Sequence, residues 1–189
     1  MEAARVCKLR GHEVTLFEEK ELGGLLHEAS VPEFKSDIRP LCKYLITQIE
    51  KLGIPVEHKK ATAADLAGYD AVICATGSRP ILPGVPGIDK PGVMDALEVL
   101  NGARKPEGRI AVIGGGLVGT ETALHLAEQG MHTTLVEMLP KIMNGVAATD
   151  QLAYSERIAK ADMEVCTGTR LVSIGDGEIT VSDHPGTHT

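Results

Sequence analysis

A run of glycines in the middle of the chain has the spacing of a phosphate-binding loop. The G-x-G-x-x-G pattern is formed by Gly114, Gly115, Gly116, Leu117, Val118 and Gly119. In such loops the first glycine makes a tight turn, the second lets a pyrophosphate approach the backbone, and the third lets a helix pack close to a strand. The N–H groups at the start of that helix then face the phosphates. The alternative is a glycine-rich turn that binds no ligand.

The segments on either side of the loop supply the context that a chance match lacks. Residues 109–113 form an apolar run typical of a strand, and residues 117–129 are helix-forming and end at Gly130. A strand that runs directly into the glycine loop and a helix that follows it distinguish a dinucleotide-binding loop from a coincidental pattern. We therefore predict that this part of the chain binds a nicotinamide dinucleotide.

Two carboxylates accompany the loop. Glu137 ends the next predicted strand, 134–136, and lies 23 positions after Gly114. A carboxylate there accepts hydrogen bonds from the adenosine ribose and repels a 2′-phosphate, so the sequence favours NADH over NADPH, although Lys141 is a nearby cation. Glu121 is expected on the first turn of the helix, where it either contacts the cofactor or is only a favourable charge near the helix N-terminus.

The beginning of the chain repeats this architecture at an offset of 119 positions. Residues 2–18 and 121–137 each contain a helical stretch, a glycine, an apolar strand and a final glutamate, and Glu18 corresponds to Glu137. Further along, residues 71–75 form an apolar run that is expected to be a parallel strand covered on both faces. The Pro- and Gly-rich residues 77–92 are expected to be the crossing between the two units.

This repeat predicts an α/β protein built from tandem Rossmann-like units, both truncated. Residues 1–88 would form a partial unit and residues 89–189 a second unit that is incomplete at its C-terminus. Met1 aligns one position after the last glycine of a loop that the first unit lacks, so we expect the chain to be an internal segment of a longer protein. The polar residues 183–189 are expected to lack regular structure.

Charge and composition exclude several classes of function. The net charge of −7 argues against a nucleic-acid partner or an anionic membrane surface. No apolar run reaches the roughly 18 residues of a membrane helix, and no apolar leader begins the chain, so a cytoplasmic location is expected. The four cysteines contain no C-x-x-C pair, so no metal site, iron–sulfur cluster or redox disulfide is expected within this segment.

Taken together, the motifs resemble the two-dinucleotide flavoproteins. The resemblance is carried by Gly-Gly-Gly-x-x-Gly-x-Glu at 114–121, by Ala75-Thr76-Gly77-Ser78-Arg79-Pro80, and by Glu21-Leu22-Gly23-Gly24. Within that group, residues 22–54 are most similar to the NADH:flavin oxidoreductase family, which includes 2-enoate reductases, 2,4-dienoyl-CoA reductases and trimethylamine dehydrogenase.

The resemblance implies that the chain is the C-terminal FAD/NAD-binding region of such an enzyme, with FAD on residues 1–88 and NAD on residues 89–189. It implies that Glu18 binds the FAD ribose, that Gly23 and Gly24 lie against FAD, and that Ala75, Thr76 and Gly77 mark the exit from the FAD domain. FMN and a 4Fe–4S cluster are expected only in a barrel outside this segment.

The expected partners are NADH and the rest of the full-length chain. Electrons would pass from NADH through FAD and the cluster to a substrate-reducing FMN site, and the segment alone is expected to be inactive on substrate. Two alternatives stay open. A disulfide reductase of the thioredoxin or lipoamide type shares the fold but needs a redox cysteine pair, and a non-catalytic dinucleotide-binding module such as a sensor would bind NAD without a flavin.

Overall fold

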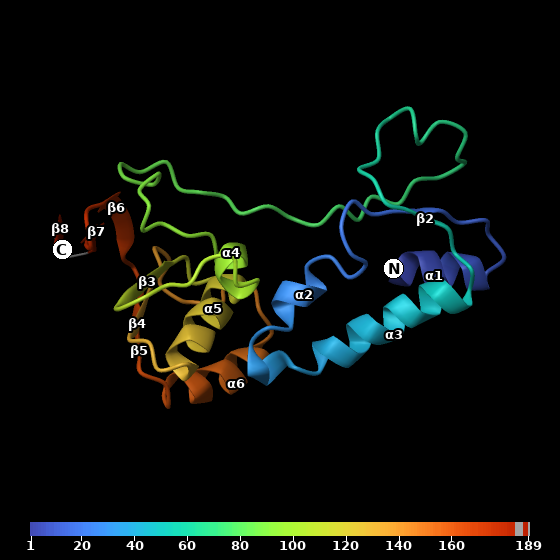
Figure 1. The fold of residues 1–189 in the computed structure, drawn as a ribbon. Helices are drawn as coiled ribbons and strands as arrows, with labels where there is room; N and C mark the ends of the chain where they lie inside the picture. The colour runs from blue at the N-terminus through green and yellow to red at the C-terminus, as the bar shows by residue number, and fades with distance from the viewer. Residues whose placement is uncertain (184–186, 189) are drawn as a thin grey trace. The chain divides into compact units, whose positions relative to one another are not determined.

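Two compact units make up the chain, Met1–Arg79 and Pro80–Thr189. The structure, a computed structural model, describes residues 1–183, 187 and 188 (Figure 1). The division falls within the Pro- and Gly-rich stretch 77–92, where prolines remove backbone donors and glycines weaken helices and strands.

The first unit is mainly helical. Its elements are α1 (Glu2–Leu9), β1 (Leu16–Phe17), α2 (Leu26–Ala29), the 3-10 helix η1 (Glu33–Lys35), α3 (Ile38–Lys51) and β2 (Val56–Glu57). Because α3 carries buried side chains at helical spacing, Cys42, Leu45 and Ile49, it presents one apolar face. That face packs beside α1 (Figure 1), where Ile49, Ala4 and Ile54 form the core of the unit.

The sheet of this unit is smaller than the sequence predicts. Strands β1 and β2 pair in parallel, with Leu16 opposite Val56. The expected strand at 71–75 is wrong: these residues form no regular structure, and Val72 and Ile73 are more than half exposed. Among the described strands of this unit, β1 and β2 pair only with each other, and the 71–75 run has no strand partner for its backbone groups.

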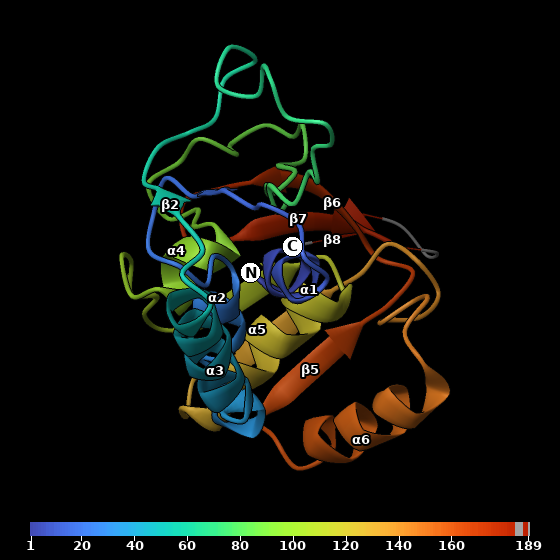
Figure 2. The ribbon, with the colours of Figure 1, turned by 90° about the vertical axis from the view of Figure 1, so that its right-hand side faces the viewer.

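The second unit is built around a parallel sheet. Its first elements are α4 (Ala96–Leu100), β3 (Ile110–Ile113), α5 (Leu117–Glu128), β4 (Thr133–Val136), α6 (Ala148–Ile158) and β5 (Met163–Cys166). The sheet order is β3-β4-β5, with all strands parallel and Ile113 opposite Val136 at the carboxyl end. Helix α5 packs across this sheet (Figure 2), and the fully buried Leu124 and Leu135 join helix and sheet. This confirms the predicted α/β class with a Rossmann-like arrangement.

An antiparallel sheet completes the second unit. It consists of β6 (Arg170–Ile174), β7 (Ile179–Ser182) and β8 (Thr187–His188), in that order. Strands β6 and β7 pair antiparallel as a hairpin, and β8 falls in the tail that was expected to lack regular structure. Residues 184–186 and 189 of that tail lie outside the described residues. Within the described part of the chain, no helix is long and apolar enough to cross a membrane.

Candidate dinucleotide-binding site

The predicted loop lies between β3 and α5, as its sequence requires. Gly116 is the N-cap residue of α5, with extended backbone angles of −67° and −178°, and no side chain caps the helix. The first N–H groups of a helix have no partner within it, so the loop ends in backbone donors that an anion can accept. Leu117 and Val118, the first two residues of the helix, are exposed at 39% and 57%.

Two of the three pattern glycines are required by the fold itself. Gly114 has a φ of 101°, which L-residues rarely adopt, and it turns the chain out of β3. A Cβ on Gly119 would collide with the carbonyl oxygen of Gly114, so only glycine lets α5 approach the end of the strand this closely. Both observations match the tasks that the pattern predicts for these positions.

Gly116 differs from the other glycines of the loop. Its φ is negative, and a Cβ built on it would meet no atom within 4 Å. Neither backbone conformation nor packing within the described residues requires a glycine there. The open space next to this residue is what a closely approaching pyrophosphate would need.

Gly115, to which the sequence assigned no separate task, is also closely packed. Its Cβ would lie 2.7 Å from Ile142 Cγ2 and 2.9 Å from Glu137 Cβ. Its N–H donates to Glu137 Oε2 at 2.6 Å, and its carbonyl oxygen accepts from the Met143 N–H at 2.6 Å and from the Thr120 hydroxyl at 3.3 Å. The peptide at this position is therefore fixed on both sides by the protein.

Glu137 lies at the end of β4 and is 8% exposed. Its second oxygen, Oε1, accepts from the Leu139 N–H at 2.7 Å. A carboxylate has about four lone-pair sites, so two backbone donors leave acceptor capacity for ribose hydroxyls. The carboxylate therefore holds the loop through the Gly115 N–H and retains lone pairs that could accept hydrogen bonds from a ribose.

Glu121 is not on the first turn of α5, where the sequence placed it, but is the fifth residue of the helix, and no acidic residue occupies the first turn. It is buried at 8% exposure and accepts a hydrogen bond from the Tyr154 hydroxyl of α6. Burial and this hydrogen bond raise the pKa of Tyr154, so the phenol stays a donor. This hydrogen bond joins α5 to α6.

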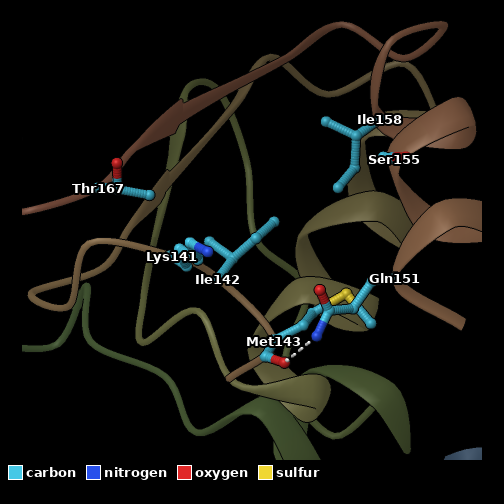
Figure 3. Close-up of a pocket in the computed structure, with 7 residues that line it drawn as sticks. All are labelled: Lys141, Ile142, Met143, Gln151, Ser155, Ile158 and Thr167. Atoms are coloured by element: carbon cyan, nitrogen blue, oxygen red, sulfur yellow. Dashed lines mark hydrogen bonds between the residues drawn. The ribbon is translucent and has the colours of Figure 1, made fainter. Parts of the chain in front are cut away.

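A cavity of about 310 Å³ lies next to these groups, between the segment after β4 and helix α6. Figure 3 shows its lining: Lys141, Ile142, Met143, Gln151, Ser155, Ile158 and Thr167. Lys141 is exposed, and Met138 and Leu139 immediately after Glu137 are 62% and 40% exposed. No arginine follows Glu137 in this segment.

The first-unit candidates are only partly explained by the fold. Glu18 follows β1, and its Oε1 accepts from the Lys20 N–H at 3.0 Å. Gly23, at a φ of 128°, has no room for a side chain because a Cβ would collide with His27 and lie 2.8 Å from Cys42 Sγ. Gly24 also has a positive φ, of 51°, but open space around it.

Ala75, Thr76 and Gly77 are exposed and lie outside regular structure. A Cβ on Gly77 would be 3.6 Å from Leu25, the residue after Gly24, so the two glycine segments come together. Among the residues expected to contact FAD, Gly77 therefore lies close to the turn at residues 23–25. Among the described residues, no hydrogen bond connects Glu18 to either of these segments.

Sequence reasoning missed the segment that follows Glu137. Ile142, Met143 and Gln151 support the glycine loop, yet none has a residue type that suggests nucleotide chemistry. The available signal was the position of the segment directly after the strand-end glutamate, where a parallel sheet directs its loops toward the site.

A parallel sheet, a glycine loop after its first strand and an uncapped helix N-terminus at that loop define a Rossmann-like dinucleotide-binding protein. Residues 1–188 match the family described as pyridine nucleotide-disulphide oxidoreductase, and the chain belongs to that family.

The chain is similar in sequence to several reductases. The chain is 38% identical to a bilirubin reductase of Mediterraneibacter gnavus over 98% of its own length and 30% of that protein. It is 42% identical to a cinnamate reductase of Clostridium sporogenes over 76% of its own length and 22% of that protein. A solved structure of 2-naphthoyl-CoA reductase superposes on the whole chain with a TM-score of 0.91 and 30% identity, over 29% of that protein. The chain therefore spans less than a third of these relatives.

We predict that Gly119→Ala destabilises the protein and that Gly116→Ser does not. Alanine is favoured over glycine within helices by about 1 kcal/mol, but at position 119 its Cβ collides with the Gly114 carbonyl oxygen, so we expect a net loss of about 1–3 kcal/mol. Serine is a good N-cap residue and meets open space at position 116. Urea unfolding followed by circular dichroism measures both, and a Gly119→Ala variant as stable as the wild type would contradict the packing argument.

Proposed function

We propose that the second unit binds NADH at the 114–119 loop and that the chain passes electrons from NADH to FAD within a larger flavin oxidoreductase. The observation that carries this proposal is Gly116, a glycine that neither backbone geometry nor packing requires, next to uncapped helical N–H groups. When bound, NADH supplies a hydride and FAD accepts it. The residues of the chain bind and orient the two cofactors.

Different residues of the second unit contact different parts of NADH. The N–H groups at Leu117 and Val118 face the pyrophosphate and bring the positive end of α5 to its charge. Gly116 leaves the space that the pyrophosphate needs. Glu137 accepts hydrogen bonds from the adenosine ribose hydroxyls while it holds the Gly115 N–H. Glu121 acts indirectly, since its carboxylate is engaged with Tyr154.

For FAD, the first unit supplies part of a site. The carboxylate of Glu18 at the end of β1 corresponds in the repeat to Glu137 and would accept from the FAD ribose. The paired segments at Gly23-Gly24 and Ala75-Thr76-Gly77 would lie against FAD, which is supported by the contact between Gly77 and the 23–25 turn. Family membership and the likeness to NADH oxidases support FAD and NAD(H) as the two cofactors.

The full-length protein is proposed to be an NADH:flavin oxidoreductase-type reductase. Its relatives named as bilirubin reductase and cinnamate reductase are more than three times as long as the matched segment, which leaves room for a substrate-reducing domain. We infer that FMN and a 4Fe–4S cluster belong to that domain and that the present chain delivers electrons to it. Its partners would then be NADH and the remainder of its own polypeptide.

A disulfide reductase is the weaker candidate. The cysteines Cys7, Cys42, Cys74 and Cys166 are all free, and burial raises the pKa of the Cys42 thiol. None of these cysteines forms a C-x-x-C spacing, so a redox pair would have to include residues outside this chain. A flavin absorption spectrum of the full-length protein separates the proposal from a non-catalytic NAD-binding module, which would be colourless.

We predict that Gly116→Val abolishes NADH binding without unfolding the protein. A Cβ at position 116 meets no atom within 4 Å, so we expect the fold to tolerate valine, whose side chain fills the space where the pyrophosphate meets the backbone. Calorimetric titration of NADH into the full-length protein measures the loss. Gly84→Val is the matched control, because position 84 is also open and lies away from the loop, and its affinity should equal that of the wild type. Unchanged NADH affinity of a folded Gly116→Val variant would contradict NADH binding at the 114–119 loop.

We also predict a preference for NADH over NADPH of at least about tenfold in kcat/KM, or about 1.4 kcal/mol. The buried Glu137 carboxylate repels a 2′-phosphate, and the residues after it, Met138 and Leu139, offer no cation. Steady-state kinetics of the full-length enzyme with both cofactors tests this. Lys141→Ala should leave the ratio unchanged. Equal use of NADPH by the wild type would contradict the prediction and show that Lys141, or a residue outside this chain, controls the choice. A ratio that rises steeply in Lys141→Ala would assign that control to Lys141.

A further inference from the structure

Met143 has an unusual backbone conformation beside the glycine loop. Its φ is 53°, and among the described residues it is the one non-glycine residue with a positive φ. The left-handed region costs an L-residue with a Cβ roughly 1–2 kcal/mol, so a methionine there needs compensation from its surroundings. Met143 is also almost fully buried, at 2% exposure.

The compensation comes from the glycine loop. In this conformation the Met143 N–H donates to the Gly115 carbonyl oxygen at 2.6 Å, and the preceding Ile142 side chain covers Gly115. On the other side, the Gly115 N–H is held by Glu137 at 2.6 Å. The two peptide groups of Gly115 are therefore fixed, and the chain direction into Gly116 and the helix N-terminus is fixed with them.

Helix α6 holds Met143 in turn. The amide nitrogen of Gln151 donates to the carbonyl oxygens of Val146 at 2.8 Å and Met143 at 3.3 Å, and the Val146 N–H donates to the Met143 carbonyl at 3.1 Å. Figure 3 shows the Gln151 side chain reaching from α6 to the Met143 backbone. The Tyr154 hydrogen bond to Glu121 ties α6 to α5 from the same helix.

We propose that residues 139–146, with Met143 in the left-handed conformation and Gln151 as its support, form a positioning element that holds the Gly115–Gly116 backbone in the geometry for pyrophosphate binding. This proposal rests on the proposed function, because it assigns a role in the binding of NADH by that same loop. A loop that is already ordered binds its ligand without a further ordering cost, so loss of this support weakens NADH binding and leaves the chemical step unaltered.

Two pairs of variants test the proposal in the full-length enzyme. Met143→Val and Met143→Gly both remove the methionine side chain, but valine resists a positive φ and glycine adopts it freely. We expect Met143→Val to raise the KM for NADH about fivefold to thirtyfold with kcat at saturating NADH unchanged. Met143→Gly also loses the buried side chain but adopts the positive φ freely, so it should raise the KM clearly less than Met143→Val.

The second pair lies on α6 and avoids the buried position. Gln151→Ala removes the two hydrogen bonds to the segment and should raise the Kd for NADH about twofold to tenfold by calorimetry. Ser155 lines the same cavity, but among the described residues its hydroxyl donates only to the Leu152 carbonyl oxygen within the helix, so the Kd of Ser155→Ala should match the wild type.

The outcomes separate this inference from the function on which it rests. Wild-type affinity in Gln151→Ala, together with equal KM values for Met143→Val and Met143→Gly, overturns the positioning role while Gly116→Val still abolishes binding. A fall in kcat with unchanged KM also overturns it. Absence of NADH binding by the wild type overturns the proposed function and the inference together.

Discussion

The carboxylate of Glu137 is the group on which the geometry of the candidate site depends. A buried carboxylate is stable only when its oxygens are hydrogen-bonded, and these oxygens take the N–H groups of Gly115 and Leu139 at 2.6 and 2.7 Å. The hydrogen bond to Gly115 joins the end of β4 to the loop after β3. The hydrogen bond to Leu139 fixes the start of the segment whose Met143 N–H donates back to Gly115. The residue proposed to bind the ribose is therefore also the residue that holds the glycine loop.

This dual role separates the glycines of the motif into two kinds. Gly114, Gly115 and Gly119 are required by the protein, either for a φ of 101° or because a Cβ would collide with neighbouring atoms. Gly116 has no such requirement. A glycine that a fold does not need is most simply explained by a ligand that approaches its backbone, and this contrast supports pyrophosphate binding more strongly than the letter pattern of the motif does.

Sequence reasoning was reliable where spacing and local chemistry coincide. The loop, its flanking strand and helix and the strand-end Glu137 follow from hydrophobic patterning and glycine spacing, which act over a few residues. The strand at 71–75 failed because its apolar run implies neighbours that the described unit does not provide. The predicted helix start at residue 117 is correct, and Glu121 lies one position beyond the first turn, where its carboxylate accepts from the Tyr154 hydroxyl of α6. The left-handed Met143 could not be predicted, because tertiary contacts alone hold a methionine in that conformation.

The central claim is that the backbone at the start of α5 receives the pyrophosphate of NADH. A crystal structure of the full-length protein with NADH tests it most directly. We predict pyrophosphate oxygens about 3 Å from the N–H groups of Leu117 and Val118, next to Gly116, with ribose hydroxyls on Glu137 and the Gly115–Met143 hydrogen bond intact. NADH bound elsewhere, with no phosphate at the 114–119 loop, would contradict the account.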